Sequence, residues 1–135
     1  MKHFLATMVS STLLLFSVAG SAQQYPPRST DRYYENRDRG VFMERVQADL
    51  DRAESTAYPS SSDAYRIARA RDEMSEFQRK MEAGTFDSRT LTDAIVSLQR
   101  IVDNNRLYER IRDSLVDDLS RLRDIRERYD SGYER

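Results

Sequence analysis

Apolar residues recur every three or four positions in four successive stretches of the chain, and this spacing constrains the fold more than any other feature. Residues three and four apart share one face of an α-helix, so each stretch predicts an amphipathic helix. The helices are expected over residues 41–57, 63–83, 88–104 and 108–129. Their apolar stripes are Phe42, Val46, Leu50, Ala53 and Ala57; Ile67, Ala70, Met74, Phe77 and Met81; Leu91, Ala94, Ile95, Leu98, Ile101 and Val102; and Ile111, Leu115, Leu119, Leu122, Ile125 and Tyr129.

The residues between the stripes are typical of helix boundaries. Pro59 ends the first helix, because the residue before a proline is driven out of the helical region. Gly84 ends the second helix, and Asp87 is a strong N-cap for the third. The predicted helices are joined by short connections, and short connections favour an antiparallel arrangement of neighbouring helices. The sequence therefore predicts an all-α antiparallel bundle of three to four amphipathic helices over residues 41–131.

Residues 1–22 have the order of a secretory signal peptide. Lys2 precedes an apolar run from Phe4 to Val18, and small residues follow the run up to Ala22. The run spans about 15 residues, fewer than the ~20 that a membrane-spanning helix needs. We therefore expect cleavage before Gln23, export to the periplasm or the extracellular space, and no stable membrane anchor after cleavage.

Two terminal segments of the mature chain carry no apolar period. Residues 23–40 contain two prolines, a glycine, three tyrosines and four arginines, and they predict a flexible leader. A Tyr/Arg strip of this kind either is a solvated tail or touches glycans or anionic envelope polymers. Residues 132–135 are expected to be a short C-terminal tail.

The composition excludes several classes of function. The chain has 22 Lys and Arg against 23 Asp and Glu, and this even mix is a poor basis for binding nucleic acid. There is no Cys, and the single His is His3, inside the signal segment. Disulfides, thiol catalysis and histidine-based metal sites are thereby excluded from the mature chain. The sequence predicts no catalytic, cofactor-binding or metal-ligating residue, no cofactor and no nucleic-acid partner.

Carboxylates are the chemistry-bearing groups that are left. The Asp117-Asp118 and Asp49-x-Asp51 pairs look acidic, but neighbours on a helix point in different directions, so neither pair predicts an active site. One internal echo is visible: the segments 46–53 and 115–122 share the pattern apolar, two residues, Asp-Leu, one residue, Arg, apolar. It records either a duplicated helical hairpin or a chance agreement between two amphipathic helices.

The sequence leaves two alternatives to a non-catalytic structural or interaction role, and the first is a chaperone. Periplasmic chaperones of the envelope-stress type carry an L-T-x-x-Q motif on long helices; here Leu91-Thr92 begins such a motif, but the glutamine comes only at Gln99. A chaperone needs open apolar surface, and the apolar residues outside the stripes are scattered over the helices. These residues are Val41, Met43, Tyr65, Val96 and Val116.

The second alternative is a small all-helical enzyme. Secreted helical chorismate mutases rearrange a dicarboxylate with cationic and polar side chains alone. Arg45, Arg52, Lys80 and Glu54 are the residues from which this chain would build such a pocket, although the spacing of that family is not matched.

Two segments of the chain carry a likeness to known proteins. The first runs from Phe86-Asp87 through Leu91, Ala94-Ile95, Leu98-Gln99 and Val102-Asp103 to Asn105, and the second is the helix segment Asp117-Asp118-Leu119…Leu122-Arg123. In these residues the chain resembles uncharacterised small secreted all-helical proteins of bacteria, over roughly residues 43–130. The resemblance implies a helical fold and export, and it brings no activity or site residue.

Together these patterns predict a non-catalytic exported helical protein with a structural or protein-interaction role. Its expected partner is an envelope protein or a second copy of the chain, so that the protein is a monomer or a weak homodimer.

Overall fold

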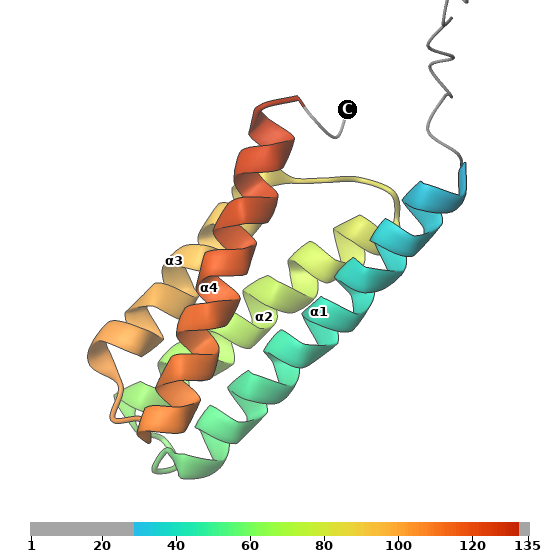
Figure 1. Cartoon of the computed structure of the whole chain (residues 1–135). Coiled ribbons are helices and arrows are strands. Elements are labelled where there is room, and N and C mark those ends of the chain that lie inside the picture. The colour runs from blue at the N-terminus through green and yellow to red at the C-terminus, as the bar shows by residue number, and fades with distance from the viewer. Residues whose placement is uncertain (1–28, 133–135) are drawn as a thin grey trace, which may run out of the picture.

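The computed structural model describes residues 29–132 of the chain, with side chains from Arg37 onward. These residues form four α-helices and no strand, which confirms the all-helical prediction (Figure 1). The helices are α1 (Ser29–Thr56), α2 (Ser62–Glu82), α3 (Ser88–Asn104) and α4 (Glu109–Asp130). The predicted signal peptide and the last three residues of the predicted tail lie outside the described residues.

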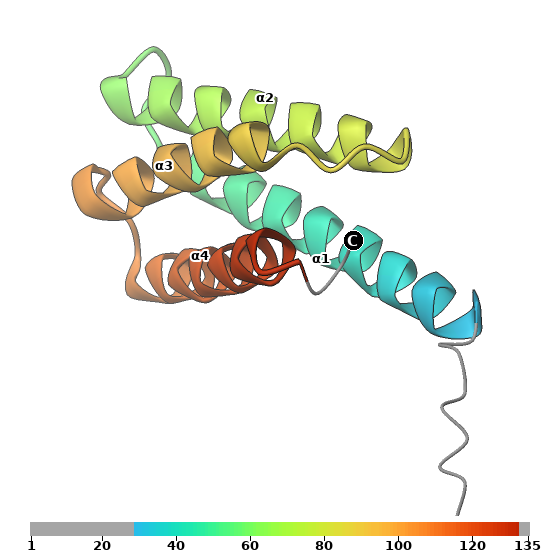
Figure 2. The same cartoon turned by 90° about the horizontal axis from the view of Figure 1, so that it is seen from above.

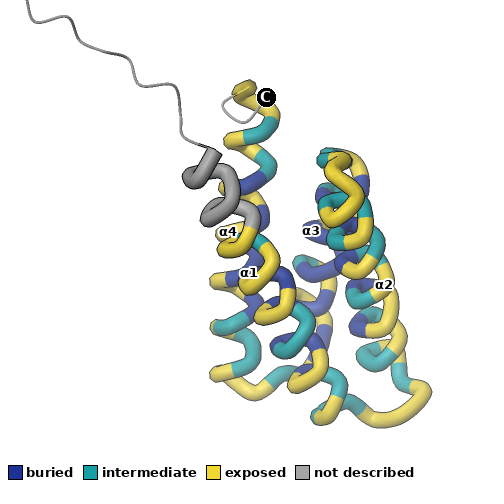
Figure 3. The backbone as a smooth tube through the Cα atoms, turned by 90° about the vertical axis from the view of Figure 1, so that its right-hand side faces the viewer, coloured by how far each residue is buried: buried dark blue, intermediate teal, exposed yellow. Residues whose placement is uncertain are grey.

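The helices alternate in direction and pack as a four-membered ring. Each helix contacts its neighbours in the chain, and α1 also contacts α4. Seen from the side, α1 and α4 form one layer, and α2 and α3 form the other (Figure 3). The view from above shows the α2–α3 layer on one side and the α1–α4 layer on the other (Figure 2). Because neighbours are antiparallel, the start of α2 lies beside the end of α3.

The four predicted stripes meet in a single core. Buried residues line the inner faces of the helices in Figure 3. The stripe residues Ala57, Met81 and Ile111 are partly buried at the edge of the core. Met43, expected outside the stripes, is buried in the core, whereas Val41, Tyr65, Val96 and Val116 are exposed as expected. The prediction for Met43 is wrong because it adjoins Phe42, and the stripe of α1 is wide enough there to include both.

Local signals define the connections between the helices. Ser61 caps α2 by accepting a hydrogen bond from the Ala64 backbone N–H at 3.1 Å. Gly84 ends α2 with a φ of +80°, a conformation that glycine adopts without steric cost. Asp87 caps α3 by accepting from the backbone N–H groups of Arg89 and Thr90, as predicted.

The beginning of α1 differs from its predicted position. The helix begins at Ser29, so residues 29–40 are helical, and the prediction of a flexible leader over residues 23–40 is wrong for them. Residues 23–28 of that leader lie outside the described residues. Extending a helix that is already packed adds a hydrogen bond for each residue fixed. No proline interrupts residues 29–40, and at Gly40 an added Cβ would meet no atom within 4 Å.

None of the helices that the structure describes is long and apolar enough to cross a membrane.

Candidate functional site

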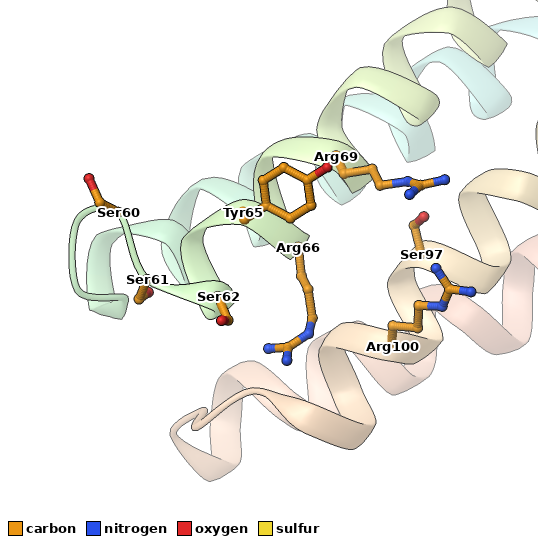
Figure 4. A pocket seen from close by; sticks show the side chains of 8 residues that line it. All are labelled: Ser60, Ser61, Ser62, Tyr65, Arg66, Arg69, Ser97 and Arg100. Carbon is orange, nitrogen blue, oxygen red and sulfur yellow. The ribbon is translucent and has the colours of Figure 1, made fainter.

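A pocket of about 440 Å³ lies between the beginning of α2 and the last turns of α3 (Figure 4). Eight residues line it: Ser60, Ser61, Ser62, Tyr65, Arg66, Arg69, Ser97 and Arg100. Three of them are arginines and none is acidic. The lining therefore offers mainly hydrogen-bond donors and positive charge.

Helical periodicity brings these residues to one groove. Tyr65 and Arg69 are four residues apart on α2, and Ser97 and Arg100 are three apart on α3, so each pair shares a face. The antiparallel contact of α2 with α3 then sets the two faces beside each other.

Arg66 uses its guanidinium to hold the bundle together. Its Nη1 lies 2.8 Å from Asp63 Oδ1 and 3.0 Å from Asn105 Oδ1. Asn105, which is buried, donates in turn to the backbone carbonyl of Asp63 at 3.1 Å. The backbone N–H of Arg106 donates to Asp63 Oδ2 at 3.0 Å. These contacts tie the first turn of α2 to the α3–α4 connection, and Asp63 pairs with the charge of Arg66.

Arg69, Ser97 and Arg100 make fewer side-chain contacts with other described residues than Arg66 does. Arg69 Nε donates to Glu73 Oε1 at 3.0 Å, and this hydrogen bond raises the pKa of Arg69 further. Arg100 has no ion pair with any described residue, and the Ser97 hydroxyl has no hydrogen bond with one, although Ser97 is only 4% exposed. In Figure 4 the two guanidinium groups extend the same way, with the Ser97 hydroxyl between them, whereas Arg66 extends away.

Charge-assisted hydrogen bonds to an oxyanion are what this arrangement supports best. Guanidinium groups present rigid forks of N–H donors that match the oxygens of carboxylates and phosphates. The pocket lining has no carboxylate, imidazole or thiol to act as a general base or nucleophile.

A second polar centre lies inside the α1–α4 layer, where Asp49 and Asp118 are 2% and 0% exposed. Arg45 Nε lies 3.5 Å from Asp118 Oδ1 and 3.8 Å from Asp49 Oδ2, and Arg52 donates to Asp49 Oδ1. Among the described residues, neither oxygen of Asp118 has a hydrogen-bond donor. Burial and the neighbouring Asp49 raise the pKa of Asp118 to about 7. A hydrogen bond from the protonated Asp118 carboxyl to Asp49 contributes to this rise in pKa.

A smaller pocket of about 350 Å³ opens beside this acid pair. It is lined by Asp49, Arg52, Arg110, Ile111 and Ser114. Asp49 already pairs with Arg52 at its wall. Because Asp49 is already paired in this way, the arginine pocket is the stronger candidate for a ligand.

The four residues named for an enzyme pocket do not converge. Arg45 and Arg52 lie on either side of Asp49, whereas Glu54 pairs with Arg71 on α2. Lys80 binds Asp87 and donates to Thr90 Oγ1 at 2.9 Å, at the opposite end of α2 from the arginine pocket.

Sequence reasoning missed both polar centres. Asp49 and Asp118 are buried, whereas their neighbours Asp51 and Asp117 are exposed. The two aspartates of each pair therefore point in different directions on their own helix. What brings Asp49 to Asp118 is the packing of α1 on α4. A signal did exist, because these two aspartates occupy the same position in the internal echo of residues 46–53 and 115–122.

No protein-family model matches the chain, and searches of curated proteins and of solved structures give no match either. The likeness to small secreted helical bacterial proteins stays a prediction from the residues quoted for it.

Proposed function

We propose that this chain is an exported, non-catalytic helical protein that acts by binding a partner protein of the cell envelope. The arginine pocket between α2 and α3 holds an acidic group of that partner. The proposal is supported above all by one observation: the pocket places Arg100, which has no ion pair with a described residue, beside the Ser97 hydroxyl, which has no hydrogen bond with one. Recognition of acidic motifs by clustered arginines is a recurring mode of protein binding.

Export is part of the proposal because of the N-terminal segment. A basic residue, an apolar run and small residues come in the order of a cleaved signal peptide. The protein would then meet its partner in the periplasm or outside the cell, as a monomer or a weak homodimer.

Site-specific photo-crosslinking in exporting cells tests the proposal. A photoreactive amino acid replaces Tyr65, which is 70% exposed at the pocket, or Val116, which is exposed on α4. We expect a covalent adduct from position 65 and none from position 116, and the Arg100→Glu change should abolish it. Arg89→Glu, on the same helix, is the matched control and should leave the adduct intact.

The mass of the adduct identifies the partner, since twice the mass of the chain indicates a second copy. Equal adducts from positions 65 and 116, or none from either, would contradict a partner site at this pocket.

A further inference from the structure

Arg69, Ser97 and Arg100 have hydrogen-bond donors that the described residues do not satisfy. We propose that these three side chains form an oxyanion clamp that binds one carboxylate group of the partner protein. This inference rests on the proposed function and names the chemical group that the pocket recognises.

The geometry supports a single ligand group between the three side chains. Ser97 lies one turn before Arg100 on α3, and Arg69 faces both from α2 (Figure 4). Glu73 holds Arg69 by its Nε, which leaves the two Nη groups of that guanidinium for a ligand. The Ser97 hydroxyl lines the pocket between the two guanidinium groups and adds a third hydrogen-bond donor to the same ligand group.

The local charge favours a carboxylate over a phosphate. Arg69 and Arg100 contribute two positive charges, and Glu73, whose Oε2 is buried, contributes one negative charge. Asp93 on α3 also acts on Arg69 electrostatically. Because Glu73 and Asp93 lie nearby, a group with one negative charge meets less repulsion here than a phosphate, which carries nearly two.

The carboxylate has two possible sources in a partner protein, an acidic side chain or the carboxy terminus, and both present the same two oxygens. Tyr65 flanks the clamp and is exposed, so the chain that carries the carboxylate can lie against its ring. The clamp itself recognises only the carboxylate, so peptides of defined ends are needed to tell the sources apart.

The test is an NMR titration of the folded chain with sodium acetate, sodium phosphate and sodium chloride at constant ionic strength. We expect acetate to produce saturable shifts at the Ser97 amide and at the side-chain Nε–H of Arg100. The Arg100→Ala and Ser97→Ala changes should weaken acetate binding, roughly tenfold or more for Arg100. Arg89→Ala removes the same charge from the first turn of α3 and should leave binding unchanged.

Two peptides then identify the source. One has an internal glutamate and an amidated end, and the other has no acidic residue and a free carboxy terminus; the peptide that displaces acetate carries the recognised group. Tighter binding of phosphate than of acetate overturns the assignment, as do unsaturable shifts, equal losses in Arg89→Ala and Arg100→Ala, or displacement by neither peptide. The acetate titration needs no partner, so its failure is distinct from a failed crosslink at position 65.

Discussion

Asp118 carries a carboxyl group that is wholly buried between α1 and α4, and this burial, together with the neighbouring Asp49, raises its pKa to about 7. In the unfolded chain this group has an ordinary pKa of 3.8. Between these two values the folded protein holds a proton that the unfolded chain releases. Linkage then requires the free energy of unfolding to fall as the pH rises from about 4 to about 7 and to level off above that.

Replacing Asp118 by Asn removes this pH dependence. The amide is nearly isosteric, has no charge to desolvate and can donate to Asp49 as the protonated carboxyl does. We expect Asp118→Asn to be more stable than the wild type at pH 8, by on the order of 3 kcal/mol, and close to it at pH 4.

Urea unfolding at several pH values measures the effect of Asp118→Asn. Asp124→Asn, an exposed change on the same helix, is the control and should keep the wild-type pH profile. A wild-type urea midpoint that stays constant from pH 4 to pH 8 would argue against the raised pKa.

The contribution of Asp87, at the start of α3, to the free energy of unfolding changes with pH in the opposite direction. Hydrogen bonds from Lys80 and Thr90 hold its pKa well below the ordinary range, so its stabilising effect is present above pH 4 and is lost as the pH falls. Asp87→Ala removes both the cap of α3 and the contact with Lys80. We expect Tm at pH 7 to fall by about 5 °C.

Circular dichroism melting measures the loss of the Asp87 cap. Asp93→Ala, an exposed position on the same helix, should change Tm little. If the two variants melt together, the cap contributes nothing.

At the scale of the element, α3 has the most completely buried stripe. All six of its predicted apolar positions are buried. Leu98 is 0% exposed, whereas Val96, two residues away, is 43% exposed. Leu98→Asp buries an unpaired charge, whose cost is comparable with the ~5–15 kcal/mol that stabilises a typical domain.

We therefore expect Leu98→Asp to abolish cooperative unfolding, and Val96→Asp to change stability by no more than about 0.5 kcal/mol. Thermal melts of the two variants check the orientation of the helix. Two melts like that of the wild type would show that the buried face of α3 is assigned wrongly.

The sequence echo between residues 46–53 and 115–122 lies on both sides of the contact between α1 and α4. Its apolar positions are buried in both helices, and its two aspartates meet across the α1–α4 contact. Its two arginines differ: Arg52 pairs with Asp49, and Arg121 lies 4.6 Å above the ring of Phe42. The same sequence pattern thus supplies buried residues to the α1–α4 interface from each of the two helices.

In the molecule as a whole, aromatic side chains join α2, the α2–α3 connection and α4 at one end of the bundle. Phe86, in the α2–α3 connection, stacks on Tyr129 of α4 with a centroid distance of 3.6 Å and meets Phe77 of α2 edge-on at 5.6 Å. The stripes are covered by one another, and the exposed large apolar residues of the described part lie on separate elements. These are Val41, Tyr58, Tyr65, Val96, Tyr108 and Val116.

The covered core predicts that the folded protein behaves unlike a chaperone. We expect little binding of a hydrophobic dye and no suppression of the aggregation of a denatured client at equimolar dose. Dye fluorescence and client light scattering measure both. Strong dye binding together with suppression would favour the chaperone alternative.

Export concerns the chain as a whole. If the segment before Gln23 is a signal peptide, the mature protein begins at Gln23. Intact-mass spectrometry of the exported protein should give residues 23–135, with or without cyclisation of Gln23. Recovery of the chain with residues 1–22 attached, in a membrane fraction, would disprove cleavage.

Local sequence patterns are enough to define the four helices and most of the core residues. The 3–4 spacing of apolar residues defines which face of each helix is buried, and Gly84 and Asp87 define helix ends, because these effects act within a few residues of the chain. The start of α1 could not be read in this way, since a helix can extend past its last packed turn without an apolar stripe.

The polar side chains that meet between helices depend on how the helices pack against one another. The Asp49–Asp118 pair depends on α1 packing against α4, and the oxyanion clamp depends on α2 lying antiparallel to α3. Periodicity places each of these residues on a face of its own helix but carries no information on the rotation and relative height of a second helix. Those quantities are set by how the side chains of the whole core interlock.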